Sequence, residues 1–281
     1  MIQTLSEILT KAQESQYAVG GFNTFNLETS QAIITAAEAQ KSPVIIQVSE
    51  KTIEYASIEE ISCIVKLLAE KASVPVAVHL DHGKTFDMAK KCVEAGFSSV
   101  MIDGSRLSYE ENIALTKSVV EMAHAKNVSV EGELGAVGKQ SEDSHTIEAM
   151  MTDPDQAMEF VDKTGVDALA IGCGTAHGVP LPDEHIHFDV IENIARKVTI
   201  PLVLHGSSNI DSESIKKAIS LGICKINIDT EIRQSFTSAA KQFLVDNPDK
   251  YDPRDFLAYA RSKAQARIEE KIQVFGSNNK V

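Results

Sequence analysis

The sequence has no closely spaced cysteine pairs. Secreted disulfide frameworks and cysteine-based zinc sites both depend on such clusters. The four cysteines instead stand singly, at Cys63, Cys92, Cys173 and Cys224. A disulfide framework and a cysteine-based zinc site are therefore both disfavoured, and we expect buried thiols in a reducing compartment.

Long apolar runs and an excess of positive charge are also lacking. No run approaches the roughly 20 apolar residues that cross a bilayer, and the residues after Met1 are mostly polar. We therefore expect no membrane span and no signal peptide. The net charge of -13 argues against a nucleic-acid partner, because nothing obvious offsets phosphate repulsion. We expect a cytoplasmic protein, in which locally positive pockets could still bind a phosphorylated metabolite.

What the sequence does contain is a regular alternation of strand-like and helical segments. Runs rich in β-branched residues predict strands, at about 17–23, 43–49, 74–82, 98–103, 128–135, 166–174, 200–206 and 222–228. Eight βα units without a break in composition predict a (β/α)8 TIM barrel, with residues 1–281 as a single domain. A doubly wound open sheet is the alternative, but Gly20-Gly21-Phe22-Asn23 is not the glycine-rich turn that usually follows its first strand.

Two further helices are predicted beyond the eighth strand, at about 229–246 and 253–273. The barrel is therefore expected to carry extra C-terminal helices. The tail from Gly276 to Val281 is expected to fray or to dock on a partner subunit.

Three of the predicted strands end in a histidine followed by glycine, at His82, His177 and His205. Barrel enzymes carry their chemistry at the carboxyl ends of the strands, so these three side chains would meet at one mouth. Three histidines that leave a fourth position open are the ligand set of many catalytic zinc sites. Any one of them could merely satisfy backbone groups. Three in equivalent positions favour a metal site.

An aspartate stands beside the first of these histidines. Asp81 could move protons while His82 binds the metal. The alternative, a lysine Schiff base, needs a lysine that projects into the mouth. The sixth strand contains no lysine from 167 to 174, and Lys225 lies two residues before the end of the eighth. Metal is therefore the better electrophile.

The remaining histidines favour simpler interpretations. His79 is expected to point into the barrel core, and His124 and His145 to be solvated. His185 and His187 could form a second ligand pair, but loop histidines at that spacing usually bind nothing.

Glycine, hydroxyl and amide residues follow the last three predicted strands. They are Gly178, Gly206, Ser207, Ser208 and the segment Asn227-Ile228-Asp229-Thr230. Backbone N–H groups and hydroxyls at a helix start after strands seven and eight form the usual phosphate site of a barrel. An ordinary turn with a helix cap is the other interpretation.

A glycine-rich segment from Gly135 to Gly138 precedes a polar stretch, 139–145. This pattern predicts a mobile flap that could close over a substrate. Glu142 is the acid or base that such a flap could bring to the mouth.

Taken together, these motifs resemble the class II, zinc-dependent fructose-bisphosphate aldolases and their tagatose-bisphosphate relatives. The similarity covers essentially the whole chain, and the combination of motifs is highly specific. The motifs are Gly21-Phe22-Asn23, His79-Leu80-Asp81-His82-Gly83, Ser99-Val100-Met101-Ile102-Asp103-Gly104-Ser105, Glu131-Gly132-Glu133-Leu134-Gly135, Gly174-Thr175-Ala176-His177-Gly178, Leu204-His205-Gly206, Lys225-Ile226-Asn227-Ile228-Asp229-Thr230 and Tyr251-Asp252-Pro253-Arg254.

The resemblance implies the reversible aldol cleavage of a ketose bisphosphate to dihydroxyacetone phosphate and a phosphorylated aldehyde such as glyceraldehyde 3-phosphate. It implies that His82, His177 and His205 hold the catalytic Zn²⁺. Asp103 and Glu133 match residues that hold the metal in an alternative, inward position or orient its ligands.

The resemblance also implies roles for residues around the substrate. Asp81 matches the residue that exchanges a proton with the C4 hydroxyl, and Glu142 matches the flap glutamate that moves a proton at the dihydroxyacetone phosphate carbon. Asn23 and Ser49 match contacts near the far end of the substrate. The residues that match the pocket for the phosphate of dihydroxyacetone phosphate are Gly178, Gly206, Ser208, Asn227 and Thr230. The family also uses a monovalent cation (Na⁺ or K⁺) beside this phosphate, and homodimers or homotetramers are expected.

Departures from the family pattern bear on the substrate. After His177-Gly178 many relatives carry a tyrosine and a phosphate-binding lysine, where this chain has residues 179–182, Val-Pro-Leu-Pro. Lys139 stands where relatives have glycine and could replace the lost charge. Asp229 is typical of enzymes for fructose 1,6-bisphosphate, whereas tagatose-specific relatives often have alanine.

Two other functional classes stay open at this point. The altered loops are compatible with a non-catalytic barrel that binds a phosphosugar. A metal-dependent barrel hydrolase is less favoured, because such enzymes commonly carry His-x-His on the first strand and residues 18–23 lack it.

Overall fold

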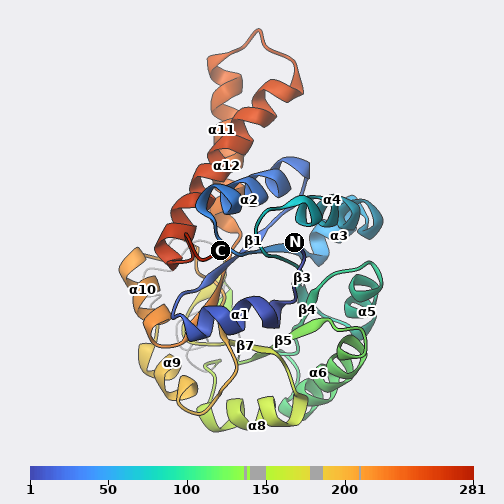
Figure 1. The fold of residues 1–281 in the computed structure, drawn as a ribbon, viewed down its shortest axis with the longest axis vertical. Coiled ribbons are helices and arrows are strands. Elements are labelled where there is room, and N and C mark those ends of the chain that lie inside the picture. The colour runs from blue at the N-terminus through green and yellow to red at the C-terminus, as the bar shows by residue number, and fades with distance from the viewer. Residues whose placement is uncertain (136–137, 140–149, 178–185, 209) are drawn as a thin grey trace.

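The predicted barrel is confirmed (Figure 1). The computed structural model describes residues 1–135, 138–139, 150–177, 186–208 and 210–281, with only the backbone of Gly138, Lys139 and His177. Its strands are β1 (Val19–Asn23), β2 (Val44–Ser49), β3 (Val76–Gly83), β4 (Ser99–Ile102), β5 (Ser129–Leu134), β7 (Ala168–Ile171), β9 (Leu202–Leu204) and β10 (Ile223–Ile228). These parallel strands close in the order β1-β10-β9-β7-β5-β4-β3-β2, so the sheet is not open. The short strands β6 (Gly138–Lys139) and β8 (Ala176–His177) pair separately.

Helices follow the strands and cover the outside of the barrel (Figure 1). They are α1 (Leu5–Glu14), α2 (Leu27–Gln40), α3 (Glu50–Ala56), α4 (Ile58–Lys71), α5 (Phe86–Glu94), α6 (Tyr109–His124), α8 (Pro154–Thr164), α9 (Phe188–Ala195), α10 (Ser212–Ser220), α11 (Thr230–Asp246) and α12 (Pro253–Phe275). Three helices begin after a capping residue whose side chain accepts a hydrogen bond from a first-turn N–H that has no acceptor within the helix. These capping residues are Asn26, Ser108 and Asp211. Every helix in the described ranges is too short or too polar to span a bilayer.

Successive side chains of each strand point alternately into and out of the barrel, and the inward ones fill it. Near the amino-terminal ends of the strands, buried apolar side chains such as Val19, Ile45 and Val203 form a cluster with Leu5 and Leu9 of α1. This helix lies across that end of the barrel (Figure 1). The intervening residues of each strand point outward and pack under the surrounding helices. The end opposite α1 is therefore the open one.

The predicted C-terminal helices are confirmed, and α11 and α12 project together beyond the barrel as a hairpin (Figure 1). The prediction for the tail is wrong, because it docks on its own chain. Ser277 is buried and its hydroxyl lies 2.9 Å from that of Ser42. The Asn279 N–H donates to the Gln40 carbonyl at 2.8 Å. These contacts use carbonyl and hydroxyl groups left at the end of α2.

The prediction of buried thiols holds for Cys92, Cys173 and Cys224, but Cys63 is exposed. The buried stripe of α4 contains Ile61, Val65 and Ala69. Cys63 lies two residues after the first of these, and therefore on a different face of the helix.

Candidate active site

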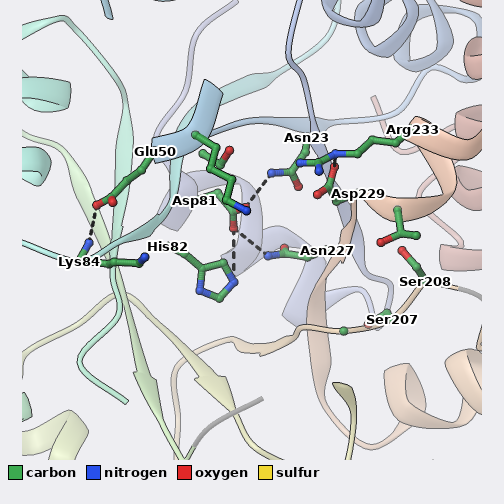
Figure 2. Close-up of a pocket in the computed structure, with 14 residues that line it drawn as sticks. Asn23, Glu50, Asp81, His82, Lys84, Ser207, Ser208, Asn227, Asp229 and Arg233 are labelled. Carbon is green, nitrogen blue, oxygen red and sulfur yellow. Dashed lines mark hydrogen bonds and ion pairs between the residues drawn. The ribbon is translucent and has the colours of Figure 1, made fainter. Parts of the chain in front are cut away.

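The carboxyl ends of the barrel strands surround a pocket of about 260 Å³ (Figure 2). Most of the predicted site residues that the structure describes line this pocket. The lining consists of Asn23, Ser49, Glu50, Lys51, Asp81, His82, Lys84, Gly206, Ser207, Ser208, Asn227, Asp229, Thr230 and Arg233. The sequence-based assignment of chemistry to the strand ends is consistent with this arrangement.

The end of β3 is irregular, and this irregularity brings two neighbouring side chains into one pocket. Consecutive residues of a regular strand point to opposite faces. Here the register with β4 shifts between Leu80 and Gly83, and His82 has the left-handed φ of 50°. Asp81 and His82 consequently both line the pocket, with Asp81 Oδ1 3.9 Å from His82 Nε2. Such backbone strain is typical of functional sites.

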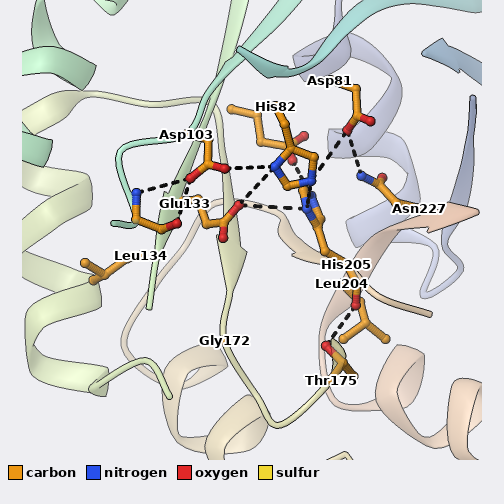
Figure 3. A network of polar contacts seen from close by, with 12 residues as sticks. Asp81, His82, Asp103, Glu133, Leu134, Gly172, Thr175, Leu204, His205 and Asn227 are labelled. Atoms are coloured by element: carbon orange, nitrogen blue, oxygen red, sulfur yellow. Dashed lines mark hydrogen bonds and ion pairs between the residues drawn. The ribbon is translucent and has the colours of Figure 1, made fainter. Parts of the chain in front are cut away.

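Three side chains at the ends of three strands form a group that could hold a metal ion (Figure 3). They are His82, Glu133 and His205, whose ligand atoms all lie within 4.8 Å of one another. His205 Nδ1 lies 3.1 Å from His82 Nε2 and 3.9 Å from Glu133 Oε2. Two imidazole nitrogens and a carboxylate oxygen are ligands that suit zinc. The structure thus brings together three of the predicted metal residues.

Carboxylates outside this trio orient its imidazoles. Asp103 Oδ2 lies 3.0 Å from His82 Nδ1, and the Asp103 Oδ1 atom accepts from the Ser105 hydroxyl at 2.6 Å. Glu131 Oε1 lies 2.9 Å from His205 Nε2. Such outer carboxylates commonly fix the tautomer and orientation of metal-binding histidines.

The electrostatic field at His82 is strongly negative. Burial opposes a charge on its ring, but Asp81, Asp103 and Glu133 together raise the pKa of His82 to about 10. The pKa of Asp103 lies well below its usual range because, against the effect of burial, His82 and Ser105 stabilise its ionised form. Surroundings that favour a proton on this imidazole also favour a divalent cation, which would compete with that proton.

Asp81 is buried and held by two amide side chains. Its Oδ2 accepts from Asn23 Nδ2 at 2.7 Å and its Oδ1 accepts from Asn227 Nδ2 at 3.4 Å. Gln47 donates in turn to the Asn23 oxygen at 3.3 Å. Burial disfavours the carboxylate, yet His82, with smaller effects from other groups, keeps the pKa of Asp81 below its ordinary value. Asp81 is therefore an ionised carboxylate with a fixed orientation, as a proton acceptor needs to be.

The described members of the predicted phosphate site also lie at this pocket. Gly206, Ser208, Asn227 and Thr230 all line it. Gly206 has a φ of 63°, and a Cβ there would lie 2.7 Å from the Ala176 carbonyl oxygen, so this turn requires glycine. The turn leaves backbone and hydroxyl groups beside an open space, as an anion site needs.

Sequence reasoning did not identify the cations of this pocket, which are Lys51, Lys84 and Arg233. Arg233 Nε lies 2.7 Å from Asp229 Oδ1, one helical turn earlier. The i,i+4 spacing of these two residues was the available signal. Burial raises the pKa of Asp229 to about 6. Ser49 lines the pocket and caps α3, accepting from the Thr52 N–H at 3.4 Å.

Several expectations for other residues are confirmed. His79 is fully buried inside the barrel, with Nδ1 2.7 Å from the Ser99 hydroxyl. His124 has an exposed side chain that pairs with Asp167 at 2.9 Å. Lys225 is fully buried beside Glu131 and does not reach the pocket, which disfavours a Schiff base at this lysine.

Some predicted site residues lie outside the described part of the chain. They are Gly178 and Glu142, together with the side chains of His177 and Lys139, and with His145 and His185 among the other histidines. The backbone of His177 belongs to β8, which follows the carboxyl end of β7 in the chain. The third histidine of the predicted zinc site stays a prediction.

The comparisons with known proteins all find aldolases. The sequence model of class-II fructose-bisphosphate aldolases matches residues 3–280. A probable fructose-bisphosphate aldolase of Bacillus subtilis is 45% identical over 279 residues, covering 98% of each chain. A fructose-bisphosphate aldolase of Geobacillus stearothermophilus is 44% identical, covering 99% of this chain and 98% of its own.

Two further similarities are to aldolases with other names. A sulfofructosephosphate aldolase of Alkalicoccus urumqiensis is 42% identical, over 97% of this chain and 96% of its own. Among solved structures, the YdjI aldolase of Escherichia coli K12 superposes with a TM-score of 0.89 at 38% identity, covering 100% of this chain and 99% of that one.

Proposed function

This chain belongs to the class-II fructose-bisphosphate aldolase family and is an aldolase, and we propose that it reversibly cleaves fructose 1,6-bisphosphate with the help of Zn²⁺. The products are dihydroxyacetone phosphate and glyceraldehyde 3-phosphate. The observation that carries the proposal is the group of His82, Glu133 and His205 beside Asp81 at the mouth of the barrel. The carboxylate and the metal-ligand set are the two parts that this cleavage needs.

The donor set fits zinc. His82 and His205 are the imidazole ligands, and His177 is the proposed third. Asp103 orients His82 through Nδ1, and Glu133, with Oε2 3.7 Å from the same nitrogen, would be a carboxylate ligand. A divalent ion here supplies stabilisation of the negative charge that cleavage of the C3–C4 bond leaves on the enediolate oxygens.

The chain itself moves the protons. Asp81 accepts the proton of the C4 hydroxyl as the bond breaks, because Asn23 and Asn227 hold its carboxylate at the pocket. Glu142 is the proposed acid or base at the carbon of dihydroxyacetone phosphate; this assignment comes from the family resemblance. The Asp81 carboxylate faces the substrate, since the neighbouring His82 takes the metal.

The two ends of the substrate bind at different walls of the pocket. Gly178, Gly206, Ser208, Asn227 and Thr230 bind the phosphate of dihydroxyacetone phosphate, with a monovalent cation beside it. Asn23, Ser49 and Asp229 contact the distal half. Lys51 and Arg233 supply positive charge for the distal phosphate, because both line the same pocket.

A substrate panel tests this function. Cleavage of fructose 1,6-bisphosphate, tagatose 1,6-bisphosphate and sulfofructose phosphate is compared with and without a chelator. We expect fructose 1,6-bisphosphate to have the highest kcat/KM and the chelator to abolish cleavage. Chelator-insensitive cleavage contradicts the metal mechanism. Absence of cleavage of every ketose phosphate favours the non-catalytic sugar-binding barrel.

The distal site has its own test. In Arg233→Ala we expect KM for fructose 1,6-bisphosphate to rise by about tenfold, the loss of one charge-assisted contact. Fructose 1-phosphate, which has no distal phosphate, should be cleaved equally by the variant and the parent chain. An equal loss for both sugars would place Arg233 outside the distal site.

A cytoplasmic homodimer or homotetramer is the proposed form of the protein. The hairpin of α11 and α12 supports self-association, since it exposes Leu244, Val245 and Tyr251 beyond the barrel. Light scattering on the purified full chain measures the subunit number. A monomer at all concentrations contradicts this part of the proposal.

A further inference from the structure

A fully buried ion pair lies inside the barrel, next to the candidate metal group. Lys225 of β10 and Glu131 of β5 are both 0% exposed, with Nζ 2.8 Å from Oε2. The contact is a close ion pair rather than an aligned hydrogen bond. Lysine and glutamate are almost never fully buried unless they are paired, and a buried pair generally adds little net stability. Stability alone therefore does not explain this pair.

Glu131 also contacts the metal-group histidine. Its Oε1 atom lies 2.9 Å from His205 Nε2, while its Oε2 atom faces Lys225 and lies 3.5 Å from His79 Nε2. One carboxylate thus stands between a fixed cation and the rear nitrogen of His205. On the opposite side of the ring, His205 Nδ1 faces His82 Nε2 at 3.1 Å.

We propose that Lys225 and Glu131 are a positioning pair that fixes His205 with its proton on Nε2 and its lone pair on Nδ1, directed at the metal. An ionised carboxylate can only accept, so His205 must donate from Nε2. The neutral ring then offers Nδ1 to the metal. This inference rests on the proposed function only in that His205 is a metal ligand.

Lys225 is needed to hold the Glu131 side chain in place, because burying a charged group is costly unless it is paired. The Lys225 ammonium lies 2.8 Å from Oε2, which leaves Oε1 facing His205. Loss of the lysine removes the contact that fixes the carboxylate, and with it the orientation of Oε1 toward the imidazole. The lysine therefore acts on the metal through Glu131 and His205, without touching it.

The test is the Zn²⁺ affinity of the full chain, measured by competition with a chromophoric chelator. In Lys225→Met we expect binding to weaken by about 10- to 100-fold, as is usual when an outer partner of a metal histidine is lost. The double variant Glu131→Gln/Lys225→Met removes both charges but keeps an oxygen for the Nε2 proton. It should bind Zn²⁺ more tightly than Lys225→Met.

Lys271→Met is the matched control. Lys271 of α12 is also buried and pairs with Glu231 of α11 at 2.7 Å, but this pair lies between helices outside the barrel interior. We expect it to keep the parent Zn²⁺ affinity within about twofold, because distant sites act independently. An equal loss of affinity in Lys271→Met and Lys225→Met would reduce the effect to general destabilisation and overturn the inference.

The remaining outcomes separate the inference from the proposed function. If Lys225→Met binds Zn²⁺ as tightly as the parent chain, the role of the positioning pair is overturned and the proposed function is not. Failure of the parent chain to bind Zn²⁺ overturns both. If Lys225→Met does not fold, NMR of the parent chain loaded with NMR-active cadmium and isotope-labelled histidine decides. Coupling of cadmium to Nδ1 of His205, with a proton on Nε2, is expected. Coupling to Nε2 overturns the inference.

Discussion

The two ends of the barrel are made from the same eight strands but have opposite chemistry. At the end that α1 covers, the inward residues are apolar, as Ile45 of β2 and Ala77 of β3 illustrate. Two residues further along β3 the inward residue is His79, and two further again it is Asp81. Position along a strand therefore separates residues that stabilise the barrel from residues that react.

The two ends also differ in what they contribute to the free energy of folding. The apolar end buries side chains that favour folding, at roughly 25 cal/mol for each Å² removed from water. The mouth instead holds charges that are buried, such as Asp81, or partly buried, such as Asp229, and their desolvation opposes folding. Substitutions at the two ends should accordingly change different measured quantities.

The largest expected effect is at the mouth. Asp81→Ala should lower kcat by about 10²- to 10⁴-fold, because it removes the proton acceptor. Its zinc content should equal that of the parent chain, since His82 and His205 keep their places. Asp81→Asn, which changes the shape less and keeps one acceptor oxygen for the neighbouring amides, should lose activity to a similar extent. Loss of zinc from either variant would contradict the role given to Asp81.

The next effect is at the covered end. Leu9 is fully buried between α1 and the strands. Leu9→Ala should lower the free energy of unfolding by about 3–5 kcal/mol, the usual cost of a large cavity. Urea unfolding of the metal-free chain measures this. Zinc stoichiometry and kcat of the folded variant should stay at parent values, and a large fall in kcat would break the separation between the two ends.

A smaller effect should appear as a pH dependence of stability. Burial raises the pKa of Asp229 to about 6 from 3.8. Between these values the folded chain holds a proton that the unfolded chain has released, so stability falls as pH rises from about 4 to about 6. The total is smaller than the roughly 3 kcal/mol expected for a fully buried group with this shift, because 34% of the Asp229 side chain is exposed and solvent screens its charge. Asp229→Asn should gain this amount relative to the parent chain between the two pH values, measured by urea unfolding without metal. A difference independent of pH would contradict the raised pKa.

The barrel and most of its mouth could be predicted from the sequence because both follow from local pattern. Alternating β-branched runs specify buried strands, and a polar residue at a strand end must lie at the mouth. Asp81 and Asn227 were found in this way, and the structure joins them by a hydrogen bond. The family motifs added Asp103 and Glu133, which sequence spacing alone would not have related to His82.

The features that escaped prediction depend on contacts between distant segments. The left-handed backbone of His82 arises where β3 changes register against β4, and strand alternation alone would have sent its side chain away from Asp81. Arg233 is the exception, because it lies in the first turn of α11, directly after the end of β10 at the pocket. The tail docks on α2 only once the barrel has brought residues 40–42 and 277–280 together.

The most direct measurement is the zinc content of the purified chain and two single-histidine variants. The parent chain should carry about one zinc ion per subunit, and His205→Ala far less, because it removes a ligand from the only group assigned to the metal among the described residues. His124→Ala, which alters an exposed histidine paired with Asp167, should match the parent chain. Full zinc occupancy in His205→Ala would contradict the account.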